Sequence, residues 1–243
     1  MDKSKTLSYF TSPLLSKHGV PHGFFTRQAN EHIVYENPPS KKYMDSAVDN
    51  RKSWLRAIDI DDHGFVFMEC ANQDKILDLG KNSPFNITLS DNDAVLTNSD
   101  QIALAFTVAD CVPIFLFEPG QRIIGIVHAG WKGTNGGIAK RTIEMMIENY
   151  KIAPKNVIAA IGPAICGKCY EVKNDVGDLF AKKYKNINNG KIYLDLVRAN
   201  IDQLKKAGVK QIDRIDICTF ENTHLFYSYR KENTPKRFAA VIG

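Results

Sequence analysis

A cysteine and a histidine stand at the ends of apolar segments in the middle of the chain, where both side chains could take part in chemistry. Cys111 lies between two apolar runs, and His128 ends a third run two residues before Gly130. A thiolate and a neutral imidazole are zinc ligands, and the same two groups can act as a nucleophile and its base. Residue type and spacing leave both chemistries open, and they also fit a packed core cysteine and histidine.

The segment after His128 favours the binding of an anion. Glycines recur through residues 130–137, and glycine lets backbone N–H groups approach a ligand closely. Successive N–H groups form concavities that bind anions. We therefore expect Lys132 and Gly133, together with Arg27 from an earlier segment, to contact an anionic substrate group. Asp110 directly precedes the cysteine and is a candidate for proton transfer or for orienting a neighbour.

The apolar runs around these residues predict buried strands. Ile102–Val108 and Val112–Phe117 flank the cysteine, and a strand over residues 122–128 is followed by a glycine-rich turn and a helix over residues 138–150. This order places His128 at the end of a sheet, beside the start of a helix. The remaining predictions are strands at 65–68, 157–161, 215–219, 225–229 and 238–242, helices at 46–58, 172–184 and 195–207, and a loop at 28–46.

Strands and helices alternate irregularly along the sequence, so we expect an α+β fold in which mixed β-sheets are flanked by helices. The length of 243 residues suits a single domain spanning residues 1–243. The arrangement gives no indication of assembly beyond a monomer or a small homo-oligomer.

The composition argues against two classes of partner, nucleic acids and membranes. The net charge is +5, but the basic residues are scattered, which argues against nucleic-acid binding and suits a small anion. No run approaches the roughly 18 apolar residues of a membrane helix, so no membrane partner is expected. The cysteine count of 5 is odd, and no secretion signal is apparent, so reduced thiols and a cytoplasmic location are expected.

Five segments carry a resemblance to the YfiH-type family, also called the laccase-domain or polyphenol-oxidase family. The central signatures are TVADCVP, HAGWKG and IGPAI, and the C-terminal ones are CTFEN and FYSYR, at Thr107–Pro113, His128–Gly133, Ile161–Ile165, Cys218–Asn222 and Phe226–Arg230. The similarity extends from about residue 26 to residue 241, nearly the whole chain.

The resemblance implies a cytosolic α+β enzyme with one zinc ion bound by a histidine, a cysteine and a second histidine. It also implies activity on purine nucleosides, either phosphorolysis of adenosine, inosine, guanosine and methylthioadenosine or deamination of adenosine. The expected partners are thus a small nucleoside and phosphate. Older assignments in the family name copper and polyphenol oxidation instead. Cys111 and His128 match the second and third zinc ligands.

The first zinc ligand of the family is replaced in this chain. Asn72 stands where the family has histidine, and Cys70 stands two residues earlier. An amide oxygen is a poor zinc ligand beside imidazole or thiolate. Alternate residues of a strand share a face, so we hypothesise that Cys70 joins Cys111 and His128 in a Cys₂His site. The two positions are about 6.6 Å apart along a strand, so this replacement requires a shift of the backbone.

Two further interpretations stay open. One is a metal-free hydrolase in which Cys111 is the nucleophile and His128 the base. The other is a non-catalytic member of the family, for which the loss of the histidine at Asn72 is the argument. The Cys166-Gly167-Lys168-Cys169 motif has no second Cys or His pair to complete a structural zinc site, so we interpret it as thiols packed near the site loop.

Overall fold

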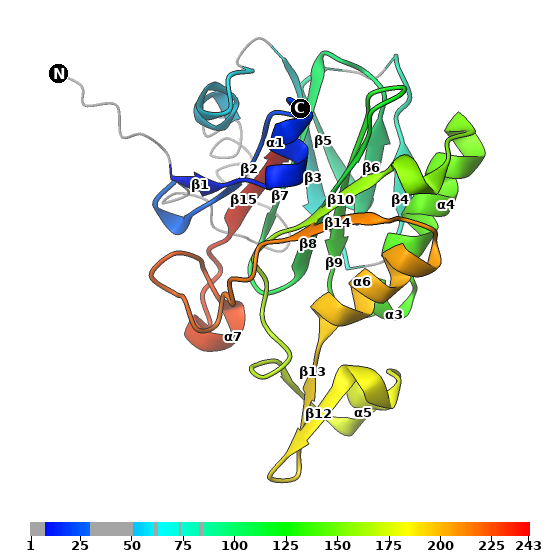
Figure 1. The fold of residues 1–243 in the computed structure, drawn as a ribbon. Coiled ribbons are helices and arrows are strands. Elements are labelled where there is room, and N and C mark those ends of the chain that lie inside the picture. Colours follow the sequence, from blue (N-terminus) through cyan, green and yellow to red (C-terminus); the bar gives the residue numbers. More distant parts are fainter. Residues whose placement is uncertain (1–7, 30–50, 61–62, 73, 83–84) are drawn as a thin grey trace, which may run out of the picture.

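The computed structural model describes residues 8–29, 51–60, 63–72, 74–82 and 85–243. This part of the chain combines three β-sheets with helices, which confirms the predicted α+β class (Figure 1). None of its helices has the length and apolar character needed to cross a membrane.

The first sheet is built from segments at both ends of the chain. Its strands, in spatial order, are β1 (Tyr9–Phe10), β2 (His22–Phe25), β15 (Phe238–Ile242), β7 (Ile102–Val108), β3 (Gly64–Cys70) and β5 (Ile87–Asn92). β3 runs parallel to both β7 and β5, whereas β15 runs antiparallel to β2 and β7. The sheet is therefore mixed.

The second sheet is also mixed. It contains β14 (Gln211–Arg214), β10 (Ile158–Ile161), β8 (Val112–Glu118), β9 (Ile123–Ala129), β6 (Ala94–Thr97) and β4 (Ile76–Asp78). β8 and β9 form an antiparallel pair in which Pro113 lies opposite His128. This register brings Cys111, just before β8, to the end of β9.

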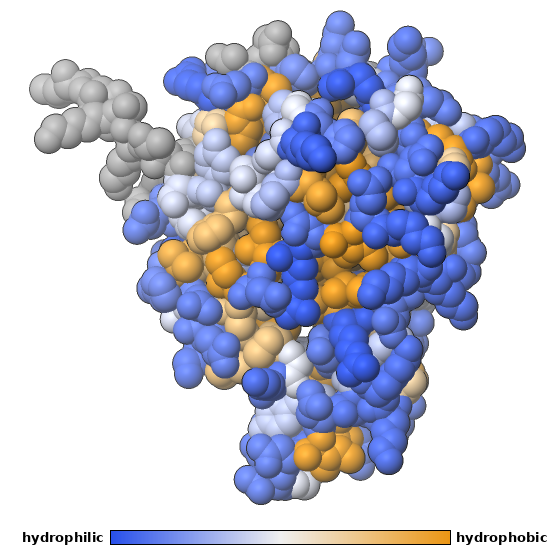
Figure 2. Space-filling view, viewed as in Figure 1, coloured by the Kyte–Doolittle hydropathy of each residue, from blue (hydrophilic) through white to orange (hydrophobic). Residues whose placement is uncertain are grey.

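A small third sheet projects from the main body (Figure 1). It consists of β11 (Glu171–Val172), β13 (Lys191–Leu194) and β12 (Lys185–Asn188). Figure 2 shows apolar side chains at the tip of this projection; Ile187 of β12 is 72% exposed.

The helices are mostly short. They are α1 (Pro13–Lys17), α3 (Trp131–Asn135), α4 (Ile138–Tyr150), α5 (Asn174–Gly177), α6 (Leu196–Lys206) and α7 (Tyr229–Glu232), with 3-10 turns η1 (Arg27–Ala29), η2 (Pro154–Asn156) and η3 (Lys182–Tyr184). Residues 51–57 are also helical. The predicted helices at 138–150 and 195–207 are confirmed, and the prediction at 46–58 is confirmed for its described part.

Three apolar clusters separate four layers. One lies between the two large sheets, one between the second sheet and helices α4 and α6, and one between the first sheet and the 51–57 helix. β7, β8 and β9 are buried along their whole length, because both faces of each sheet are covered. Strands in that position read as continuous apolar runs, which is why the sequence predicts them well.

Three predicted elements are wrong. Residues 172–184 form no continuous helix, since α5 ends at Gly177, where a Cβ would lie 3.0 Å from Ile192 of β13. Residues 215–219 make only an isolated bridge, between Ala164 and Cys218. Residues 225–229 turn back on Asn222, whose carbonyl accepts two backbone N–H bonds. In the segment 225–229 a local turn replaces the ladder partner, whereas residues 215–219 bond irregularly to residues 161–164. Residues 30–46 of the predicted loop lie outside the described residues.

Candidate active site

Three chemistry-bearing residues meet where the two large sheets end. Cys70 is the last residue of β3, His128 is near the end of β9, and Cys111 follows the turn between β7 and β8. They line a pocket of about 300 Å³, together with Asn72 and Asp110. The pocket therefore brings together the cysteine and histidine predicted from the central motifs and the two residues, Cys70 and Asn72, predicted at the end of β3 and just after it.

His128 is held in a fixed orientation by Asp93. The Nδ1–H of His128 donates to Asp93 Oδ1 at 2.8 Å, and the His128 backbone N–H donates to the Asp93 carbonyl at 2.7 Å. Both side chains are buried. A carboxylate bound to one ring nitrogen fixes the tautomer and leaves the other nitrogen available to a metal or a substrate.

Cys70 reaches His128 because β3 is irregular at its end. The register between β3 and β5 shifts between Met68 and Cys70, and such a bulge re-aims the side chains that follow it. The ligand atoms of Cys70, Asp93 and His128 all lie within 4.8 Å of one another. Cys70 and His128 therefore lie close enough to share a bound ion.

The pKa values of Cys70 and His128 are shifted by burial and by the ionisable groups beside them. Burial raises the pKa of Cys70, and His128 partly offsets this. Burial lowers the pKa of His128, but Cys70, Cys111 and Asp93 together raise that pKa well above its ordinary value. A cation bound between the thiols would displace their protons, because thiolates are the metal-binding form.

Gly130 forms the opposite wall of this cluster. A Cβ at Gly130 would lie 3.0 Å from Asn72 Oδ1, 3.2 Å from Cys111 Sγ and 3.8 Å from His128 Cε1. The absence of a side chain therefore leaves a small space bordered by an amide oxygen, a thiol and an imidazole.

This donor set fits a thiophilic metal ion. Two thiols flank one imidazole, a combination that binds zinc and also suits Cu(I). The carboxylate–imidazole pair and the space beside Gly130 complete the features expected of such a site. Cys70, Cys111 and His128 would hold the ion, and Asn72 lies beside them.

Asp110 performs a structural task in the pocket wall. Its φ of 81° is positive, and its Oδ1 accepts a 2.7 Å bond from the hydroxyl of Thr219. Its Oδ2 accepts a 2.7 Å bond from the backbone N–H of Arg230. Asp110 thus ties the β7–β8 turn to two segments near the C-terminus.

Aromatic and basic side chains form the outer part of the pocket. The Arg230 guanidinium lies 4.7 Å from the centre of the Tyr170 ring, and Arg237 lies 5.6 Å from the centre of the Tyr229 ring. All four residues line the pocket. Aromatic faces with adjacent guanidinium groups suit a planar ring that carries, or lies near, an anion.

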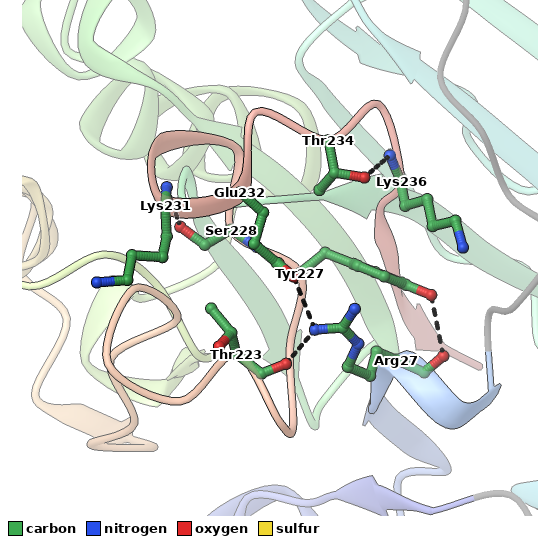
Figure 3. Close-up of polar contacts among 8 residues, drawn as sticks. All are labelled: Arg27, Thr223, Tyr227, Ser228, Lys231, Glu232, Thr234 and Lys236. Atoms are coloured by element: carbon green, nitrogen blue, oxygen red, sulfur yellow. Dashed lines mark hydrogen bonds and ion pairs between the residues drawn. The ribbon is translucent and has the colours of Figure 1, made fainter.

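The substrate-binding residues predicted from the sequence lie elsewhere. Arg27, Lys132 and Gly133 are not among the residues that line this pocket. Figure 3 shows the Arg27 guanidinium directed at the Thr223 carbonyl and at Glu232, and it also covers the Tyr227 ring at 4.4 Å. Lys132 is exposed and lies near the Trp131 ring.

Sequence reasoning missed Asp93, Tyr170 and Tyr229 as members of the site. Asp93 occupies the short turn between β5 and β6, outside every run that patterning singles out. The available signal for it was a single acid directly before the apolar Ala94–Thr97 strand. Arg230 and Arg237 line the pocket, whereas Arg27, the arginine expected from the sequence to contact an anion, does not.

Comparison with known proteins gives the family. Residues 40–243 match the family described as multi-copper polyphenol oxidoreductase laccase. The purine nucleoside phosphorylase of Deinococcus radiodurans is 40% identical over 158 residues, which cover 63% of this chain and 61% of that protein. Adenosine deaminase RL5, from an unknown prokaryotic organism, is 38% identical over 149 residues, covering 57% of this chain and 56% of that protein.

The match to these two relatives therefore spans roughly three fifths of their length. A solved structure extends the similarity to the whole fold. YlmD from Geobacillus stearothermophilus superimposes with a TM-score of 0.85 at 26% identity, covering 100% of this chain and 97% of that one. The chain belongs to the family described as multi-copper polyphenol oxidoreductase laccase.

Proposed function

We propose that this protein is a zinc-dependent enzyme that acts on purine nucleosides, by phosphorolysis or by deamination of adenosine. The observation that carries the proposal is the convergence of Cys70, Cys111 and His128 at a pocket with aromatic and basic walls. Relatives named purine nucleoside phosphorylase and adenosine deaminase support the same substrate class.

In this proposal each residue has a defined task. Cys70, Cys111 and His128 hold the ion, and Asp93 orients the imidazole. A bound zinc ion supplies Lewis-acid activation of water or of a substrate oxygen. Asn72 lies beside the ion and contacts substrate or water through its amide, since amide oxygen is a poor zinc ligand.

The outer wall of the pocket receives the substrate. Tyr170 and Tyr229 stack on the purine, and Arg230 and Arg237 contact phosphate in place of the Arg27, Lys132 and Gly133 set. Arginine suits this task because its planar fork binds phosphate through two parallel hydrogen bonds. Asp110 keeps the wall in position through its bonds to Thr219 and Arg230.

The test combines metal analysis with a nucleoside screen. Elemental analysis of the purified chain identifies the metal and thereby distinguishes zinc from copper. Cys70→Ser is expected to lower the zinc content by one equivalent per chain and to abolish release of free base or of deaminated product. Asn72→His in the Cys70→Ser background supplies a second imidazole and is expected to restore the lost equivalent. Histidine tolerates the positive φ of 55° at this position.

A metal-free Cys–His hydrolase is the second candidate. It is favoured by one observation: Cys111 and His128 line the same pocket, and Asp93 orients the His128 imidazole. That order is the nucleophile–base–acid arrangement of cysteine hydrolases. Hydrolysis that survives metal removal but is lost on alkylation of Cys111 would favour this candidate. An unchanged metal content in Cys70→Ser would refute the zinc proposal, and a folded chain with neither activity would indicate a non-catalytic member.

A further inference from the structure

A second group of metal-ligating side chains lies apart from the active-site residues. The sulfur atoms of Cys166, Cys169 and Cys218 and a carboxylate oxygen of Glu221 all lie within 4.8 Å of one another. Cys218 and Glu221 come from a segment 52 residues further along the chain than the Cys166–Cys169 motif. The fold thus completes a motif for which the sequence offered no second pair.

The donor types and their spacing match a tetrahedral zinc site. Zinc binds thiolate sulfur at about 2.3 Å and carboxylate oxygen at about 2.0–2.2 Å. Four donors at those lengths lie roughly 3.8 Å or less from one another in a tetrahedron. The observed limit of 4.8 Å requires only a small contraction, and Cys169 Sγ already lies 3.5 Å from Glu221 Oε1.

The turn that carries the first two cysteines is held in place by neighbours. The backbone N–H of Cys169 donates to the Cys166 carbonyl at 3.0 Å. Asn186 Nδ2 donates to the Gly167 carbonyl at 2.9 Å. A Cβ at Gly167 would lie 2.5 Å from the Asp195 Cβ, so the turn packs tightly against the start of α6. The two thiols are therefore presented by a fixed backbone.

Cys218 accepts a backbone hydrogen bond from the first cysteine of the motif. The backbone N–H of Cys166 donates to Cys218 Sγ at 3.3 Å. Hydrogen bonds to the charged form favour that form. The fold packs three thiols and a carboxylate against one another, an arrangement that a bound cation would stabilise.

We propose that Cys166, Cys169, Cys218 and Glu221 form a second, structural zinc site. The site is separate from the active-site cluster because no residue is shared between the two. Its metal would join the loop after β10 to the segment before α7. Both segments also build the active-site pocket: Ile165 and Tyr170 line it, and Thr219 donates to Asp110. The proposed ion would thus stabilise the two segments that form this wall of the active-site pocket.

The test uses the full chain with the active-site thiols removed. In Cys70→Ser/Cys111→Ser the remaining cysteines are those of the proposed site. Elemental analysis is expected to find one zinc per chain, and titration of the three thiols with a mercurial is expected to release it to a metallochromic indicator. Adding Cys169→Ser should remove this zinc, and Glu221→Gln should weaken its binding at least tenfold in a competition assay. Lys168→Ser changes the same turn without removing a donor and should retain the zinc.

Three outcomes would overturn the proposal: no zinc in the double variant, zinc that survives both Cys169→Ser and Glu221→Gln, or a disulfide among the three cysteines detected by intact mass. If the double variant does not fold, the wild-type background gives the same answer. There, Cys169→Ser and Cys70→Ser should each remove a separate equivalent, so the two sites succeed or fail independently.

Discussion

Asp93 accepts a 2.8 Å hydrogen bond from His128 Nδ1 while both of its oxygens also receive backbone N–H groups. The N–H donors belong to Asn72 and Asp74, each at 3.0 Å. One carboxylate, 1% exposed, therefore positions the imidazole and the turn after β3 at the same time. Asp93 thus positions both His128 and Asn72, which border the proposed metal site.

Asp93→Asn should lower the affinity of the active-site metal about 10–100-fold, the usual effect of removing a partner of a ligating histidine. Competition with a chelator of known affinity measures the change. Asp91→Asn is the matched control, because Asp91 is an exposed acid two residues away and should leave the affinity unaltered. Equal affinities in the two variants would show that Asp93 has no part in metal binding.

Gly130→Ala should reduce metal binding without unfolding the chain. The backbone at Gly130 has a φ of −71°, which alanine adopts freely, so the effect arises from the Cβ placed between Asn72 and Cys111. Metal content and thermal unfolding are measured together. Gly120→Ala, in the β8–β9 turn, where the Cβ would meet the Glu118 carboxylate, is the control. Full metal content in Gly130→Ala would exclude this space as part of the site.

Asp110→Asn should destabilise the chain by about 1–3 kcal/mol, because a buried hydrogen-bonded carboxylate is lost. Asparagine tolerates the positive φ, so backbone strain does not contribute. Combining it with Thr219→Val in a double-mutant cycle should give a coupling energy of about 0.5–3 kcal/mol, measured by urea denaturation. Additive effects would mean that the 2.7 Å contact between the two side chains contributes nothing.

Arg230→Lys tests the proposed phosphate contact. Lysine keeps the charge but loses the planar fork and the stacking on Tyr170, so the KM for phosphate should rise about tenfold, equivalent to about 1.4 kcal/mol. Initial rates of phosphorolysis at varied phosphate give the value. Arg122→Lys, at an exposed turn, should have no effect. A change in the KM for nucleoside alone would assign Arg230 to the base instead.

Because of His22, the free energy of unfolding should decrease as the pH is lowered through the mildly acidic range. Burial lowers its pKa below 6.5, and its Nε2 accepts the Ser12 N–H at 2.7 Å, which requires the neutral ring. The unfolded chain binds the proton more readily, so this contribution is complete above about pH 6.5 and is lost as the pH falls below it. The slope is at most about 1.4 kcal/mol per pH unit.

Urea denaturation between pH 7.5 and 5.5 measures this dependence. His22→Gln keeps a donor and an acceptor but does not titrate, so its stability should fall less steeply than that of the wild type. His224→Gln, which removes an exposed imidazole, is the comparison. Parallel curves for the wild type and His22→Gln would contradict the prediction.

The sequence predicts the parts of the fold whose patterning is determined by burial. β7, β8 and β9 are buried throughout and almost entirely apolar because both faces are covered, and Cys111 and His128 stand out because they lie at the ends of such runs. Asp93 could not be identified in this way, since its importance depends on contacts with β9 and with the turn after β3. The bulge that brings Cys70 to His128 depends on pairing with β5, which local sequence does not encode.

The segments predicted incorrectly share a physical feature. Residues 215–219 and 225–229 are apolar enough for strands, but irregular bonds to residues 161–164 in the first and a turn on Asn222 in the second satisfy their backbone groups instead. The same contacts bring Cys218 beside Cys166. Spacing along the chain therefore could not reveal the second cysteine cluster.

The position of β15 inside the first sheet has a consequence during synthesis. β15 lies between β2 and β7, so neither neighbour can complete its pairing until residues 238–242 have left the ribosome. At 5–20 residues per second, β2 waits roughly 10–40 s for its partner. During that interval the nascent chain exposes two apolar strand edges that are targets for chaperones. The first sheet is therefore completed only when this late strand is inserted between two segments that were synthesised long before it.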